Sequence, residues 1–125
     1  MRIIVIGGTG TIGKGVVEAL KTEHEVISVG YKDGDYQVDL GSKESIEKMF
    51  TDNPNIDGVI STAGVANFGP LASQSDEDYQ LALNNKLMGQ VNLVRVGMKF
   101  IKGNGSITLT SGILAQRPNP GSASV

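Results

Sequence analysis

The chain has 125 residues, of which 39% are hydrophobic, and a formal net charge of −2. This length fits one domain with a core of ordinary size. Acids and bases are interspersed, so no basic stripe favours nucleic acid or an anionic membrane as a partner. The absence of cysteine excludes disulfides and thiolate metal sites, and a single histidine gives no basis for a histidine-rich metal site. No apolar run approaches the roughly 20 residues that span a bilayer, and the N-terminal residues do not resemble a signal peptide. We therefore expect a cytoplasmic protein without a membrane, nucleic-acid or metal partner.

Apolar runs and amphipathic stretches alternate in the first half of the chain. The β-branched run at residues 2–6 predicts a buried strand, and the helical spacing of apolar residues at 11–22 predicts a helix. Residues 25–29 predict a second strand, and Val38-Asp39-Leu40 a short third strand. Residues 42–50 predict a second helix with a serine N-cap.

The longest periodic stretch runs from Asp76 to about Lys102, where apolar residues recur every three or four positions. This spacing predicts one continuous helix. Ser75 and Asp78 match a capping box at its start. Gly103-Asn104-Gly105 is the expected C-cap and turn at its end.

Residues 57–62 and 106–110 predict two further strands, and residues 111–125, rich in Gly, Pro and Ser, predict a loop. Continuous apolar strands that alternate with helices indicate a parallel sheet with helices on both faces. We therefore predict the α/β class, with a Rossmann-type doubly wound parallel sheet in three α/β/α layers. The expected strand order is 3-2-1-4-5, with residues 38–40 counted as the third strand.

A glycine-rich loop, Gly7-Gly8-Thr9-Gly10-Thr11-Ile12-Gly13, joins the first predicted strand to the first predicted helix. In this context, glycines at positions 7, 10 and 13 indicate dinucleotide binding. Gly7 permits the sharp turn, Gly10 lets the backbone approach a pyrophosphate, and Gly13 lets the helix pack closely on the strand. The free N–H groups at the start of the helix favour the anion. The alternative is a glycine-rich turn that binds no ligand.

This loop and three later segments resemble, in the same order, motifs of the short-chain dehydrogenase/reductase family. Asp39-Leu40 resembles the pair that faces the adenine ring, and Ser61-Thr62-Ala63-Gly64 is similar to the family's Asn-Asn-Ala-Gly segment with both Asn replaced. Leu109-Thr110-Ser111-Gly112 resembles the strand end that carries the catalytic serine. The resemblance covers the whole chain. It implies a single NAD(P)-binding Rossmann domain over residues 1–125, as the N-terminal part of a longer family domain without its C-terminal β–α units.

The end of the second strand decides between NAD and NADP, because an acid there bonds the ribose 2′-hydroxyl and a base accepts a 2′-phosphate. The sequence at this end, Val29-Gly30-Tyr31-Lys32, has no acid, so Lys32 favours NADP over the alternative, NAD. Lys32 as an ordinary solvated turn residue is the competing interpretation. The cofactor-binding residues implied by the motifs are Gly7, Thr9, Gly10, Thr11, Ile12, Gly13, Tyr31, Lys32, Asp39, Leu40, Ser61, Thr62, Ala63 and Gly64.

The family pattern breaks after Ser111. The resemblance implies a tyrosine acid/base followed four residues later by a lysine, because a nearby cation favours the ionised phenol. In the best-matching segment, Gly121 stands at the tyrosine position and Val125 at the lysine position. Ser111 retains the implied role of a hydrogen-bond donor to a carbonyl. The alternative is a serine that caps the turn after the strand.

Family members also carry an asparagine midway along the long helix. Aligned without gaps on Tyr79 and Gly89, this position holds Lys86, whereas Asn85 fits after a slip of one residue. A lysine there can polarise a carbonyl or fix the nicotinamide ribose, and an exposed helix lysine is the alternative. The candidate catalytic residues are therefore Ser111, Lys86 and Asn85.

Three functions are compatible with these observations. The first is an NAD(P)-dependent oxidoreductase that acts on a small carbonyl or alcohol substrate. The second is a non-catalytic NADP-binding module, either a pseudo-enzyme or a redox sensor, which the missing tyrosine and lysine favour. The third is a methyltransferase-like domain, which the lack of an acid at the end of the second strand disfavours. We also expect apolar surface around residues 106–110 and a homo-oligomer formed through the helix at 76–102.

Overall fold

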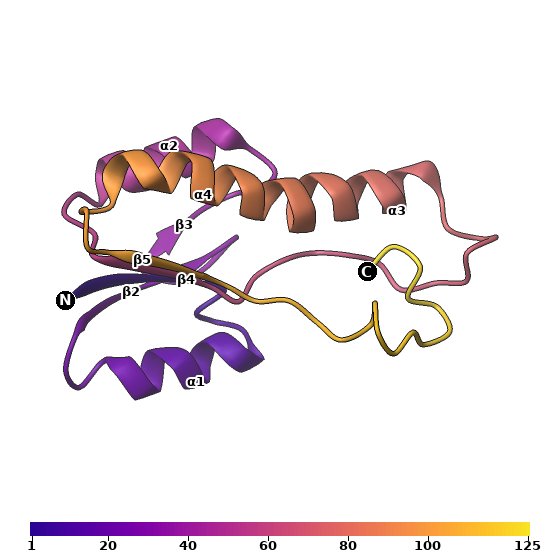
Figure 1. Ribbon diagram of the computed structural model, residues 1–125, viewed down its shortest axis with the longest axis horizontal. Coiled ribbons are helices and arrows are strands. Elements are labelled where there is room, and N and C mark those ends of the chain that lie inside the picture. Colours follow the sequence, from indigo (N-terminus) through magenta and orange to yellow (C-terminus); the bar gives the residue numbers. More distant parts are fainter.

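The structure is a computed structural model that describes residues 1–125 and contains a five-stranded parallel sheet in the order β3-β2-β1-β4-β5. The strands are β1 (Arg2–Ile6), β2 (Glu25–Gly30), β3 (Tyr36–Gln37), β4 (Gly58–Ser61) and β5 (Ser106–Leu109). The helices are α1 (Thr11–Leu20), α2 (Lys43–Asp52), α3 (Asp76–Leu81), the π-helix η1 (Ala82–Leu87) and α4 (Met88–Phe100). Helix α1 lies on one face of the sheet, α2 and α4 lie on the other, and α3 extends past the strands (Figure 1). This arrangement confirms the predicted three-layer, doubly wound fold.

Most of the core lies between the sheet and the two helices α2 and α4. Apolar side chains of β1, β2 and β4 are buried there together with Ile46, Met49 and Phe50 of α2 and Leu93 and Val96 of α4. Burying one such side chain contributes about 1.5–3 kcal/mol. This packing fixes α4 over the sheet and thereby sets where η1 and α3, which precede α4, lie beyond the strand ends.

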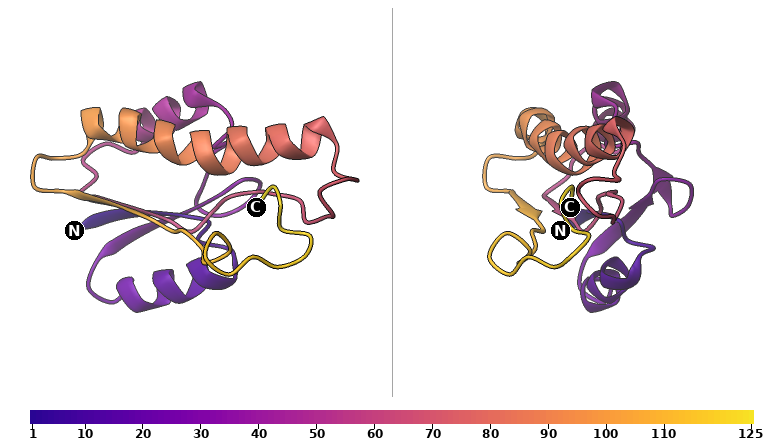
Figure 2. Two further views of the ribbon diagram at one scale, coloured as in Figure 1. Left: turned by 45° about the vertical axis from the view of Figure 1, so that its right-hand side comes forward. Right: turned by 90° about the vertical axis from the view of Figure 1, so that its right-hand side faces the viewer.

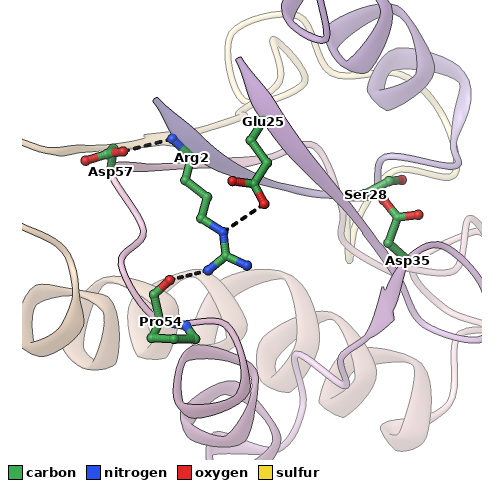
Figure 3. Close-up of polar contacts among 6 residues, drawn as sticks. All are labelled: Arg2, Glu25, Ser28, Asp35, Pro54 and Asp57. Atoms are coloured by element: carbon green, nitrogen blue, oxygen red, sulfur yellow. Dashed lines mark hydrogen bonds and ion pairs between the residues drawn. The ribbon is translucent and has the colours of Figure 1, made fainter.

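Polar contacts of Arg2 join three segments at the amino ends of the strands (Figure 3). The backbone N–H of Arg2 donates to the Asp57 carboxylate at 2.8 Å. Its guanidinium group donates to Glu25 at 3.1 Å and to the carbonyl of Pro54. These contacts support the register in which Arg2 of β1 stands beside Glu25 of β2.

The third strand begins and ends earlier than the sequence predicts. The strand order is confirmed, but β3 comprises Tyr36 and Gln37, and residues 38–40 lie beyond it. Asp39 turns the chain away from the sheet, because its Oδ1 accepts from the N–H of Gly41 at 2.9 Å and its carbonyl from the N–H of Ser42 at 3.0 Å. Ser42 then caps α2 as predicted.

The long helix of the second half runs in one direction, but it is not α-helical throughout. The π-helix η1 separates α3 from α4, which the regular apolar spacing did not predict. The capping box of Ser75 and Asp78 at the start of α3 is confirmed. At the other end the helix stops at Phe100, and Ile101 is already extended. The prediction that Gly103-Asn104-Gly105 forms the C-cap was therefore wrong, and these residues lie in the turn after the helix.

Apolar side chains are exposed beside β5, as the sequence predicts, and also along the long helix. Leu109 and Ile113 are exposed at the end of β5 and after it, and Leu83, Leu87 and Met98 along the helix. No helix in the structure combines the length and apolar character that crossing a membrane requires.

Candidate functional site

The candidate site lies at the carboxyl ends of the parallel strands, where the chain order reverses between β1 and β4. In a doubly wound sheet, this switch point is where ligands bind. A cavity of about 750 Å³ opens there, within the roughly 300–1,000 Å³ typical of ligand pockets. Its walls come from the glycine-rich loop, the end of β2, residues 38–41, the segment after β4, and one side of α3 and η1.

The glycine-rich loop has the geometry that its spacing predicts. Gly7 has a positive φ of 80°, a conformation that glycine adopts readily and residues with a side chain rarely do. Its N–H donates to the carbonyl of Val29 at 2.7 Å. A Cβ at Gly13 would lie 1.9 Å from the carbonyl oxygen of Gly7, so α1 packs directly on the loop. Gly10 is the N-cap of α1 and offers no side-chain acceptor to the first N–H groups of the helix. These groups are therefore available to an anion, which is how a pyrophosphate fits this loop.

An acid lies at the carboxyl end of β2, although residues 29–32, which form that end in the sequence, include none. The turn at Gly34, where φ is 88°, folds the chain back and brings Asp33 against Gly30 and the glycine-rich loop. Asp33 Oδ1 accepts a hydrogen bond from the Thr9 hydroxyl at 2.9 Å. The inference from sequence that no acid is present here was therefore wrong, because the acid comes from the following turn.

Tyr31 and Lys32 form the outer part of the same strand end. Tyr31 is exposed and lines the cavity, whereas Lys32 lies outside the lining. The Lys32 Nζ stands 5.9 Å from the centre of the Tyr31 ring, a distance at which a cation and an aromatic face attract one another. The ammonium group is therefore next to the cavity rather than in it.

Two further segments complete the wall of the cavity. Asp39 and Leu40 line the cavity, and the Asp39 backbone N–H donates to Ser45 Oγ at 2.9 Å, which fixes this stretch to the start of α2. After β4, the Thr62 hydroxyl donates to the carbonyl of Ile6 at 3.0 Å and ties the segment to β1. Ser61 is buried and lies outside the cavity lining.

Asn85 in η1 closes the cavity from the helix side. Its Oδ1 accepts a hydrogen bond from the N–H of Val65 at 2.9 Å and so fixes the segment after β4. A π-helix joins residues i and i+5 instead of i and i+4, and π-helical turns recur at functional sites. In this chain η1 places Asn85 on one cavity and Lys86 on the next.

A second cavity of about 790 Å³ lies on the other side of η1 and over the end of β5. Lys86 and Ser111 both line it, so the structure brings these two candidate residues into one cavity. The Lys86 side chain also lies against Gly64, where a Cβ would stand 3.2 Å from Lys86 Cγ. Lys86 therefore stands between the two cavities.

Most of the expected cofactor residues line the first cavity: Gly7, Thr9, Gly10, Tyr31, Asp39, Leu40, Thr62, Ala63 and Gly64. Those outside its lining are Thr11, Ile12, Gly13, Lys32 and Ser61. Sequence reasoning missed Glu77, Gln80, Leu81 and Asn84, which line it from the helix side. The sequence carried no signal for these four, because only the approach of the helix to the strand ends selects them.

Comparison with known families agrees with this geometry. The profile of a family described as "Enoyl-(Acyl carrier protein) reductase" matches residues 8–125. The chain belongs to the short-chain dehydrogenase/reductase family. The chain differs from the family pattern at two positions. Gly121 and Val125 stand where the pattern implies the tyrosine and the lysine.

Several known proteins are similar over most or nearly all of the chain. The protein lin1944 from Listeria innocua has a TM-score of 0.95 at 39% identity, over 99% of this chain and 62% of that one. A small-chain dehydrogenase solved in complex with NADPH has a TM-score of 0.88 at 28% identity, over 99% of this chain and 56% of that one. The bifunctional ribulose 5-phosphate reductase/CDP-ribitol pyrophosphorylase Bcs1 of Haemophilus influenzae is 31% identical over 80% of this chain. The chain spans 22% of the length of Bcs1.

Proposed function

We propose that this chain is the NAD(P)-binding part of an oxidoreductase that acts on a small carbonyl or alcohol compound. The observation that carries the proposal is the first cavity, whose floor is a glycine-rich loop with the first N–H groups of α1 uncapped. The cavity extends from this loop to Asp39 and Leu40 on one side and to Gly64 on the other. This extent suits an elongated ligand whose pyrophosphate lies at the loop.

The chemistry is a hydride transfer. When bound, the nicotinamide ring supplies or accepts the hydride at its C4 atom. In the reducing direction, the carbonyl carbon gains the hydride and the carbonyl oxygen takes a proton from solvent water, which gives an alcohol. In our proposal the Ser111 hydroxyl donates a hydrogen bond to that oxygen, and the Lys86 ammonium, in the same cavity, stabilises the negative charge that develops on it. Asn85 fixes the segment between the two cavities through Val65.

We favour NADP over NAD as the cofactor. The Lys32 ammonium, beside Tyr31 at the end of β2, is the group that would pair with a 2′-phosphate. The related small-chain dehydrogenase in complex with NADPH supports the same choice. Asp33 is the group that favours NAD, and its carboxylate already accepts a hydrogen bond from Thr9.

The proposal includes a homo-oligomer that forms through the helical stretch 76–102. Leu83, Leu87 and Met98 leave an exposed apolar stripe along this stretch, and such a stripe is stabilised when a second surface covers it. Leu83 and Leu87 also line the second cavity, so the proposed contact between copies lies at the edge of that cavity.

The test is a titration of the protein with NADPH and NADH, followed by an assay of NADPH consumption against a panel of aldehydes and ketones. We expect micromolar binding of NADPH, weaker binding of NADH, and turnover of at least one carbonyl. A protein that binds neither nucleotide would contradict the proposal.

The second candidate function is an NADP-binding module without turnover. The observation in its favour is the pair Gly121 and Val125 at the positions where the family pattern implies the acid/base tyrosine and its lysine. The same titration separates the two functions, because tight NADPH binding without consumption of any carbonyl supports the module.

A further inference from the structure

Residues 111–125 are attached to the rest of the fold through one segment, 67–74. The N–H of Gly69 donates to the carbonyl of Gly121 at 2.8 Å. Gly69 and Ser122 thereby form an isolated parallel β-bridge. The Ser124 hydroxyl donates to the carbonyl of Asn67 at 2.9 Å. The remaining hydrogen bonds of residues 111–125 join near neighbours within the segment. Figures 1 and 2 show the C-terminus lying beside the segment that leads from β4 to α3.

Gln74 is at the centre of this attachment. Its Nε2 donates to the carbonyl of Asn67 at 2.6 Å and to Ser124 Oγ at 2.7 Å, so one amide group bridges the two segments. Its Oε1 is buried without a hydrogen-bond partner. A buried polar group is stable only where its hydrogen bonds outweigh the cost of removing it from water. The two bonds of Nε2 therefore account for the placement of this side chain.

The same contacts are anchored to the start of α3. Asn67 Nδ2 donates to Asp78 Oδ1 at 2.7 Å, and the N–H of Ser75 donates to Asp78 Oδ2 at 2.9 Å. The hydrogen bond from Asn67, followed by those from Ser75, lowers the pKa of Asp78. We call the set Asn67, Gln74, Asp78 and Ser124 the clasp. It joins the helix start, the β4–α3 segment and the segment after β5.

We propose that Gln74 is a positioning residue that holds residues 119–125 in place, of which 123–125 form one wall of the second cavity, and thereby sets the affinity of that cavity for substrate. Ala123, Ser124 and Val125 line this cavity together with Lys86 and Ser111. Displacement of the wall would widen the cavity but leave the glycine-rich loop untouched. The effect on substrate rests on the proposed function, whereas the effect on the wall itself does not.

The test compares Gln74→Glu with the parent chain. The substitution keeps the shape of the side chain but puts a carboxylate oxygen next to the Asn67 carbonyl, where two acceptors repel. We expect hydrogen exchange of the amides at 119–125 to be at least about tenfold faster, whereas that of β1 and β4 and the NADPH affinity stay unchanged. With the carbonyl compound that turns over fastest, KM should rise several-fold and kcat should change less than twofold. Ser73→Ala, which removes a local hydrogen bond to Pro70 in the same segment, is the matched control.

Each outcome decides the proposal. Unchanged exchange at 119–125 overturns it, as does a fall in kcat at constant KM. If exchange accelerates throughout the sheet, Gln74→Glu has unfolded the protein. The test is then repeated with Ser124→Ala, which removes the hydrogen bonds of the Ser124 hydroxyl to Gln74 and Asn67. Faster exchange confined to 119–125 in Ser124→Ala then supports the clasp, and any other pattern overturns it. Exchange needs neither nucleotide nor turnover, so a parent chain that fails to bind NADPH contradicts the proposed function without affecting this result.

Discussion

The glycines of the glycine-rich loop, Gly7, Gly10 and Gly13, are required for different reasons. A Cβ at Gly7 would lie 2.8 Å from the Thr62 hydroxyl, and one at Gly13 would overlap the Gly7 carbonyl, so the fold itself requires both residues. At Gly10 the nearest atom to such a Cβ is the Gly7 oxygen at 3.3 Å, and φ is −81°. The fold therefore constrains position 10 less severely than positions 7 and 13, and we attribute the main requirement for glycine there to the dinucleotide of the proposed function.

Gly10→Val should consequently abolish dinucleotide binding in a folded protein. We expect NADPH affinity to fall by more than about tenfold, equivalent to about 1.4 kcal/mol, because the branched side chain occupies the approach to the N–H groups of α1. Titration followed by NADPH fluorescence measures the loss. Gly15→Val is the matched control, since a Cβ at Gly15 has no neighbour within 4 Å. A Gly10→Val protein that melts cooperatively and binds NADPH as the parent does would contradict the site.

Under the proposed function, we expect the choice of cofactor to depend on two neighbouring residues of opposite charge, Lys32 and Asp33. Lys32→Glu should weaken NADPH binding by about tenfold and NADH binding much less, because it puts a negative charge where the 2′-phosphate is expected. Asp33→Asn should have the opposite selectivity and weaken NADH more than NADPH. Dissociation constants for both nucleotides and both variants provide the measurement. Equal weakening of the two nucleotides by Lys32→Glu, or a parent that prefers NADH, would refute the choice of NADP.

These residues also show what the sequence can and cannot reveal. The glycine spacing fixes a local geometry, so Gly7 and Gly13 were placed correctly from the sequence alone. Asp33 was not, because its position depends on the turn at Gly34 folding back on Gly30. Gln74 was also missed, because its partners Asn67 and Ser124 are brought together by two separate loops.

At the scale of elements, periodicity locates a helix but does not reveal a change of helix type. The apolar spacing from Asp76 onward is regular, and the sequence gives no sign that η1 interrupts it. The short strand was misplaced for a related reason: Val38-Asp39-Leu40 has the composition of a strand, but Asp39 bonds to Gly41 and Ser42 and ends the extended conformation. Side-chain hydrogen bonds compete with strand pairing over such short distances.

The π-helix leads to opposite expectations for Asn85 and Lys86. Asn85→Ala removes the hydrogen bond to Val65, which lines the first cavity, and should weaken NADPH binding several-fold. Lys86→Met should leave NADPH affinity near that of the parent and lower kcat by at least about tenfold, because Lys86 lines the second cavity with Ser111. Nucleotide titration and steady-state kinetics separate these effects. If Lys86→Met changes neither quantity and Asn85→Ala changes one, Lys86 is an ordinary surface lysine.

The amino ends of the strands make stability depend on pH in the acid range. The backbone N–H of Arg2, followed by the ammonium of Lys102, lowers the pKa of Asp57. A carboxylate whose pKa is lowered on folding stabilises the native state fully above its unfolded pKa, about 3.9. This stabilisation is lost as the pH falls through the lower folded value.

We therefore expect the urea midpoint of unfolding to be steady above about pH 5 and to fall below about pH 4. Asp57→Asn should lower the midpoint at pH 7 and make it less sensitive to acid. Because Tyr36 and Lys48 lower the pKa of Asp52, and Asn67 and Ser75 that of Asp78, part of the dependence should remain in this variant. An Asp57→Asn profile parallel to that of the parent would show that the contact with Arg2 does not contribute.

For the whole molecule, the distribution of apolar surface is uneven. The face of the sheet under α2 and α4 is well buried, whereas the helical stretch 76–102 exposes Leu87 at 54% and Met98 at 73% of their surface. Leu109 at the end of β5 is also exposed. Exposed aliphatic side chains in a row favour association, because burial of apolar area contributes about 25 cal/mol per Å².

The 125-residue chain should therefore associate reversibly through this stripe. We expect sedimentation equilibrium to give a mass that rises with protein concentration. Concentrations of about 10–100 micromolar suit a dimer whose dissociation constant is on the order of tens of micromolar. Leu87→Lys should shift the chain toward the monomer, because a charge in the middle of an apolar contact must lose its hydration. Leu71→Lys is the control, since Leu71 is also exposed, at 72% of its surface, but lies in the segment before α3. If Leu87→Lys and Leu71→Lys weaken association equally, the contact between copies does not involve the stripe. If the unsubstituted chain stays monomeric at every concentration, the stripe is not an interface between copies.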